Sequence, residues 1–349
     1  MSIRIRIAAA LLAGALSVAP LAAQAQSTTI QVPAAKKWKH VGTGVIVPQA
    51  LAGLPRTGIT DSTAGEFDVS IQFGNPESTQ LTIYLFRPAL ASVPVWFDRA
   101  ETQILDRDIF GHAAPVSDPI AFAPPGTTTA SALRRVYVPE KRTFTATGAA
   151  MVPLGEWLVA ARLSSTSLDP AALDAKLLEA LAALGWPAPV AGAAPDAIAA
   201  PIQPCTTPAG FSAKAKVKKP DMGAALLGAL LANAADDPDI KKTPVEGPQG
   251  LCREGKPGAE TATYRTLGDG KGYVIALGDA GRTISVYPEF VLDKGEPGYA
   301  VTFNDLATSY VYPSFDRLPE PGKAFEMVRK SRPISSSTRG SKALTIHTP

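Results

Sequence analysis

The residues from 67 to 73, FDVSIQF, alternate strictly between apolar and polar side chains. This period of two predicts a strand with one buried face, with Ile71 on the apolar side and Asp68 on the polar side. The run Thr79–Phe86 follows a Gly-Asn-Pro turn and is apolar on both sides, as expected for a central strand. From Pro94 to Leu105 the period lengthens to about 3.6, which predicts a helix that packs on these strands. The apolar side of this helix carries Trp96, Phe97, Ala100 and Ile104.

The next hundred residues repeat this order. A helix begins behind Asp169, a good N-cap, with Pro170 in its first turn, and Gly185 is placed to end it. Burying its four leucines is worth roughly 6–12 kcal/mol before entropic costs, so this helix should dock on the sheet. We expect both helices to cover the face that carries Ile71 and Ile83. The leucines are Leu173, Leu177, Leu181 and Leu184, and the strands before them are predicted over Leu133–Val138, Thr143–Val152 and Glu156–Ser164.

The sequence therefore predicts an α+β fold: an antiparallel sheet with two packed helices (strand-strand-strand-helix, twice) over residues 28–186, followed by a smaller β-rich module over residues 205–333. A first strand is expected at His40–Val47, a Pro- and Ala-rich linker over residues 187–204, and a flexible tail over residues 334–349. The element order is similar to that of PsbP-like domains, in which helices pack on an antiparallel sheet. This resemblance implies an architecture and no function.

The N-terminus indicates export. Two arginines, an apolar run over residues 7–19 and the small-x-small site Ala23-Gln24-Ala25 have the layout of a signal peptide, residues 1–25, cleaved after Ala25. Its removal leaves 32 basic and 31 acidic side chains. A nearly neutral chain lacks the basic patch that nucleic-acid binding requires. We expect a periplasmic or secreted protein with no transmembrane span in the mature chain.

Two cysteines, Cys205 and Cys252, bracket a low-complexity insert over residues 206–251. In an oxidising compartment this count favours a disulfide, which would destabilise the unfolded chain by roughly 4 kcal/mol. Metal binding and a catalytic thiol are the alternatives, and the sequence places no histidine near either cysteine. Within the insert, the apolar residues 222–235 predict a short helix, packed on its own domain or completed by a membrane surface or an envelope partner protein.

No motif selects catalytic, cofactor-binding or metal-ligating residues. The histidines His40, His112 and His347 are isolated, and neither GxSxG nor SxxK occurs. Gly268–Gly272 and the acidic residues 236–239 fit turns better than phosphate or calcium sites. The indole rings of three tryptophans could line a ligand pocket between sheet and helix, although core packing is the more economical explanation. These are Trp96, Trp157 and Trp186.

The sequence thus favours a non-enzymatic binding or interaction module of the cell envelope, with no cofactor. Two alternatives stay open. One is a hydrolase with dispersed acidic residues, because paired carboxylates need only spatial proximity. The other is a carrier of a small apolar ligand held between the sheet and the helix of residues 94–105.

Overall fold

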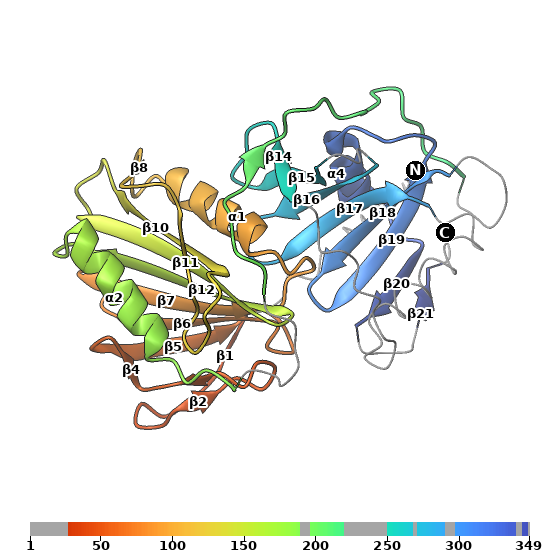
Figure 1. Ribbon diagram of the computed structural model, residues 1–349. Helices are drawn as coiled ribbons and strands as arrows, with labels where there is room; N and C mark the ends of the chain where they lie inside the picture. The colour runs from red at the N-terminus through yellow and green to blue at the C-terminus, as the bar shows by residue number, and fades with distance from the viewer. Residues whose placement is uncertain are drawn as a thin grey trace, which may run out of the picture.

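The computed structural model describes residues 27–188, 196–219, 250–267, 271–289, 297–339 and 344–347. The predicted signal peptide with Ala25, the apolar segment 222–235, the acidic residues 236–239 and the first part of Gly268–Gly272 lie outside these ranges. The described chain is mostly sheet, arranged as one large antiparallel sheet and a second β-rich sheet, with short helices (Figure 1). This agrees with a β-rich α+β class. Among the described residues, no helix is long and apolar enough to cross a membrane.

The first sheet has the order β1-β5-β6-β7-β12-β11-β10-β8, and all of its pairs are antiparallel. Its centre joins the two predicted strand groups, because β7 pairs with β12 along eight residues. The strands are β1 (Thr28–Thr29), β4 (Ala50–Leu51), β5 (Leu54–Asp61), β6 (Asp68–Gly74), β7 (Thr79–Phe86), β8 (Ala114–Pro115), β9 (Ile120–Phe122), β10 (Ala132–Val138), β11 (Ala146–Leu154) and β12 (Trp157–Ser165), with β4 paired to β5 and β9 to β10.

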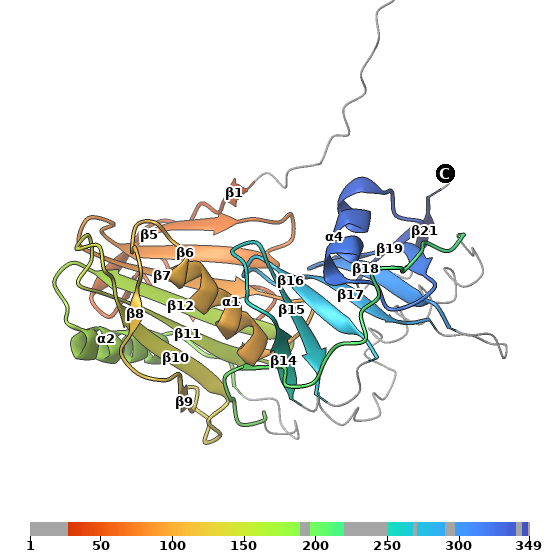
Figure 2. The same ribbon diagram turned by 90° about the horizontal axis from the view of Figure 1, so that it is seen from above.

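Two helices cover opposite faces of this sheet (Figures 1 and 2). Helix α2 (Pro170–Ala182) closes the core that contains Ile71 and Ile83, both fully buried. Helix α1 (Val93–Leu105) packs with Phe86, Met151 and Leu158 on the other face. The expectation that both helices cover the isoleucine face is therefore wrong. β7 is apolar on both sides, so each of its faces can bury a helix.

The second sheet runs from β13 to β21 in sequence order and is antiparallel except for the pair β13–β14. One face packs against α4 (Pro321–Lys330). The predicted tail after residue 334 instead supplies β20 and β21, because its serines and threonines extend the backbone ladder beside β19. The strands are β13 (Gln203–Pro204), β14 (Leu251–Glu254), β15 (Thr261–Thr266), β16 (Tyr273–Leu277), β17 (Arg282–Pro288), β18 (Tyr299–Asp305), β19 (Thr308–Phe315), β20 (Ser335–Thr338) and β21 (Leu344–Ile346).

The predicted strand His40–Val47 is also different in the structure. It is a short ribbon, β2 (Trp38–Lys39) and β3 (Ile46–Val47), closed by a turn in which the Gly44 N–H donates to the His40 carbonyl at 2.9 Å. Gly44 has a φ of 73°, a conformation that glycine adopts without strain, so the glycine ends the extended run.

Candidate functional site

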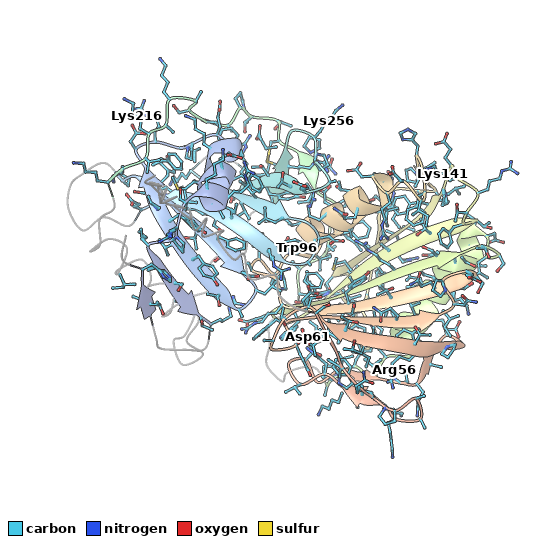
Figure 3. The ribbon with its side chains drawn as sticks, turned by 180° about the vertical axis from the view of Figure 1, so that it is seen from behind. Arg56, Asp61, Trp96, Lys141, Lys216 and Lys256 are labelled. Carbon is cyan, nitrogen blue, oxygen red and sulfur yellow. A yellow bond between two sulfur atoms is a disulfide. The ribbon has the colours of Figure 1, made fainter. Side chains whose placement is uncertain are left out.

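Helix α1 lies between the two sheets, and Figure 3 shows Trp96 at their junction. The helix begins behind Ser92, whose Oγ accepts a hydrogen bond from the Val95 N–H, and Pro94 lies in its first turn. Its apolar residues share one cluster with Ala262, Tyr264 and Ala276 of the second sheet. Both sides of α1 are therefore buried, one against each sheet.

The side of α1 that faces the second sheet carries a fully buried arginine. The Arg99 guanidinium donates to three backbone carbonyls, those of Gly278 (2.7 Å), Gly258 (2.9 Å) and Ala259 (2.6 Å). The neighbouring Asp98 accepts from the Tyr264 hydroxyl at 2.6 Å and pairs with Arg253. These bonds fix the loops of the second sheet against the helix, because a guanidinium has a rigid fork of donors.

One of these loops is the tight turn between β16 and β17, residues 278–281. The Ala89 N–H donates to the Gly281 carbonyl at 2.9 Å, so the turn rests on the chain that follows β7. Gly281 has a φ of 93°, and a Cβ there would lie 2.9 Å from the Cα of Pro88. Only glycine permits this approach, which brings Asp279 and Ala280 over the first sheet.

Under this turn lies a partly enclosed cavity of about 130 Å³. Its floor follows the register of the central strands, in which Ser70 pairs with Tyr84 and Tyr84 with Ala160. The wall nearest α1 is apolar, and the wall under the turn is charged. The lining comprises Ser62, Asp68, Ser70, Tyr84, Phe86, Ala100, Ala149, Ala150, Met151, Ala160, Ala161, Arg162, Asp279 and Ala280.

Asp68 is the least solvated acid in this lining, with 8% of its surface exposed. Burial raises the pKa of its carboxyl from 3.8 to about 6, Arg282 opposes this rise, and Asp279 and Asp61 add to it. The Nη1 atom of Arg282 lies 3.9 Å from the Asp68 Oδ2 atom, beyond hydrogen-bonding distance. The same arginine donates from Nε to Asp305 at 2.7 Å.

The other charges at the cavity pair with each other. Arg162 donates to Asp279, which joins β12 of the first sheet to the turn of the second. The Arg162 guanidinium also lies over the Tyr84 ring, with its carbon 5.6 Å from the ring centroid. The arrangement offers a small apolar space edged by the Asp68 carboxylate and the Arg162–Asp279 pair, which suits binding of a small molecule.

A second hollow is a wider and more open groove of about 760 Å³ beside the Phe67 and Trp157 rings, whose centroids lie 6.1 Å apart. His40 does not line this groove; it is fully buried behind it, with its ring edge-on to the Trp157 ring. The His40 Nδ1 accepts from the Thr43 N–H at 3.2 Å, and Nε2 lies 2.9 Å from the Glu66 carbonyl. The ring is thus satisfied as neutral imidazole, and burial lowers its pKa.

The residues singled out from the sequence lie elsewhere. Cys205 and Cys252 form a disulfide, with their sulfur atoms 1.97 Å apart. His112 is exposed, and the His347 Nε2 lies 3.0 Å from the Ser336 hydroxyl. Trp96 is a fully buried core residue, whereas Trp157 and Trp186 are half-buried. In the described chain, no group of three or more His, Cys, Asp or Glu residues is placed to hold a metal ion.

The sequence alone did not predict that Asp68, Arg162 and Asp279 lie around one cavity. Alternation placed Asp68 on a polar face, and a polar face ordinarily meets water. The available signals were weak: the charges at positions 98 and 99 inside an apolar helix, and the two glycines that flank Asp279 and Ala280. These signals indicate that another part of the chain packs on α1, but they do not identify the 278–281 turn as that part.

Comparison with protein-family models, curated proteins and solved structures finds no match to this chain. The functional assignment therefore depends on the geometry of the cavity.

Proposed function

We propose that this is an exported, non-enzymatic binding protein of the periplasm or cell exterior, and that its ligand site is the cavity between the first sheet, α1 and the 278–281 turn. The observation that supports it is a nearly buried carboxylate, Asp68, at the edge of an apolar cavity. A charged group in such a place costs stability, and such costs concentrate at functional sites.

The position of the cavity also favours binding. It lies at a junction between two sheets, where ligand pockets often occur. A bound molecule would contact residues of both sheets, such as Tyr84 from the first and Asp279 from the second. The cavity adjoins the helix of residues 93–105, so the carrier alternative from the sequence agrees best with this geometry.

The signal-like N-terminus supports export, and the disulfide is compatible with it, because disulfides persist in oxidising compartments. An envelope partner for residues 222–235 stays a proposal, since that segment lies outside the described residues.

The test is to fill the cavity. Ala160 is a buried residue of its lining, and Ala160→Leu adds three carbon atoms there. Ala121 of β9 is exposed, so Ala121→Leu adds the same volume in solvent. A fragment library screened by ligand-observed NMR should give binders of the wild type and of Ala121→Leu that Ala160→Leu does not bind.

Fragments that bind all three proteins equally would show that the cavity is not the site. A library with no binder would count against the binding function itself. Circular dichroism checks that the Ala160→Leu protein is folded, because overpacking a core costs typically 1–3 kcal/mol.

A further inference from the structure

The chemistry of the cavity also indicates a class of ligand. Asp68 has 8% of its surface exposed and lines the cavity, and its contact with Arg282 is 3.9 Å long. A carboxylate that is largely withdrawn from water is stabilised by hydrogen-bond donors. An N–H donor of a molecule in the cavity would supply such a bond.

The charges around Asp68 favour a cationic donor. The acids near it are Asp61 and Asp279, which both raise its pKa by repulsion, and Asp305 beyond Arg282. The bases are Arg162 and Arg282, and each donates to another acid, Asp279 or Asp305. Of these groups, Asp68, Asp279 and Arg162 line the cavity, so two carboxylates face one guanidinium there. Arg282 lies behind Asp68 and is paired with Asp305, which leaves an excess of negative charge in the lining. The other titratable group there is the Tyr84 phenol.

The rest of the cavity limits the size and polarity of the ligand. Beyond Asp68 the lining is made of the rings of Tyr84 and Phe86, the Met151 side chain and several alanines. Its volume of about 130 Å³ is close to that of an apolar cavity of about 150 Å³ that holds benzene. A molecule with one ring or a short alkyl chain fits this space.

We propose that the cavity binds a small primary amine, with its ammonium group on the Asp68 carboxylate and its apolar body between the central strands and Ala100 of α1. This inference rests on the proposed function, and it adds the charge and the size of the ligand.

The experiment compares three probes of one shape and different charge: benzylamine, benzyl alcohol and benzoate. Calorimetric titration of the mature full-length chain at pH 7.5 should show benzylamine binding at least tenfold more tightly than benzyl alcohol, and benzoate most weakly. Asp68→Asn should abolish the preference for the amine. Asp118→Asn makes the same charge change at a fully exposed side chain and should keep it.

A second measurement needs no substitution. Benzylamine stays protonated between pH 5 and 7.5, whereas Asp68, with a pKa of about 6, becomes largely neutral at pH 5. The affinity of benzylamine should therefore fall about tenfold from pH 7.5 to pH 5, whereas the affinity of benzyl alcohol should not change.

The outcomes separate the two proposals. Binding of benzyl alcohol or benzoate as tightly as benzylamine, lost in Ala160→Leu, would overturn the amine assignment and leave the cavity as the binding site. So would a preference for benzylamine that survives in Asp68→Asn. Binding of none of the probes, while library fragments still bind the wild type and not Ala160→Leu, would overturn the amine assignment alone. Amine binding that Ala160→Leu does not change would overturn both proposals.

Discussion

Helices α1 and α2 have the same length and the same kind of start, yet they stabilise the protein differently. Each has thirteen residues, a proline in its first turn and a side-chain cap, Ser92 or Asp169. α2 buries leucines on one side and exposes the other. α1 is buried on both sides, and the second of these carries the charged pair Asp98 and Arg99.

The difference comes from what lies behind each helix. Behind α2 is solvent, so water can satisfy those of its polar residues that have no protein partner. Behind α1 is the second sheet, whose loops end in backbone carbonyls that face the helix, and Arg99 satisfies three of them. An apolar face tolerates any side chain of similar volume, whereas a polar contact depends on donor geometry. The contact through α1 is thus the more specific of the two.

The largest expected effect is that of Arg99→Ala. It removes the donors to the carbonyls of Gly258, Ala259 and Gly278 and leaves them buried, at a cost of roughly 3–5 kcal/mol in the free energy of unfolding. Arg107→Ala, just beyond the end of α1 at an exposed position, is the control and should change stability by less than about 0.5 kcal/mol. Urea unfolding measures both. A loss of under 1 kcal/mol for Arg99→Ala would mean that the guanidinium does not hold the second sheet.

Leu177→Ala tests the α2 side and should cost roughly 2–4 kcal/mol, because Leu177 is fully buried and its removal leaves a cavity. The sharper comparison uses conservative changes. Leu177→Met keeps the volume and should cost less than about 1.5 kcal/mol. Arg99→Lys keeps the charge but loses the fork of donors, so it should cost more than Leu177→Met. The reverse order in urea unfolding would contradict the distinction between the two helices.

The same contrast explains what the sequence could predict. The caps and leucines of α2 are local signals, and the structure has this helix at residues 170–182, within the predicted span. For α1 the local pattern predicted the helix and its apolar side. It could not predict that Asp98 and Arg99 are buried, because their partners lie about 150 to 180 residues further along the chain. The Asp68 cavity was missed for the same reason.

Asp98→Asn on α1 and Asp174→Asn on α2 are a matched pair of charge removals. Asp98 is buried and accepts hydrogen bonds from Tyr264 and Arg253. Asp98→Asn should therefore lower the free energy of unfolding by about 2 kcal/mol. Asp174 pairs with Arg134 nearer the surface, at 2.9 Å, and 27% of its side chain is exposed. Asp174→Asn should therefore lower the free energy of unfolding by less than about 1 kcal/mol. Equal losses in urea unfolding would show that burial does not set the strength of these pairs.

The smallest net effect in the wild type is expected in the pH dependence of stability, because two buried groups act there with opposite sign. On the α1 side, Asp68 has a folded-state pKa of about 6, above its unfolded value of 3.8. Its contribution to the free energy of unfolding is therefore complete below pH 3.8 and is lost as the pH rises to about 6. Burial lowers the pKa of His40 below 6.5, so its contribution to the free energy of unfolding is complete above pH 6.5 and is lost as the pH falls.

The Asp68 slope covers pH 3.8 to about 6 and the His40 slope lies below pH 6.5, so the two overlap below about pH 6 and should partly cancel in the wild type. Asp68→Asn should reveal the His40 slope, so that the free energy of unfolding rises with pH over this window. His40→Gln keeps a side-chain N–H donor toward the Glu66 carbonyl and should reveal the Asp68 slope, so that stability falls with rising pH. Urea unfolding at half-unit pH steps measures both curves. If the two variants have the same slope, the opposite titration of these groups is refuted.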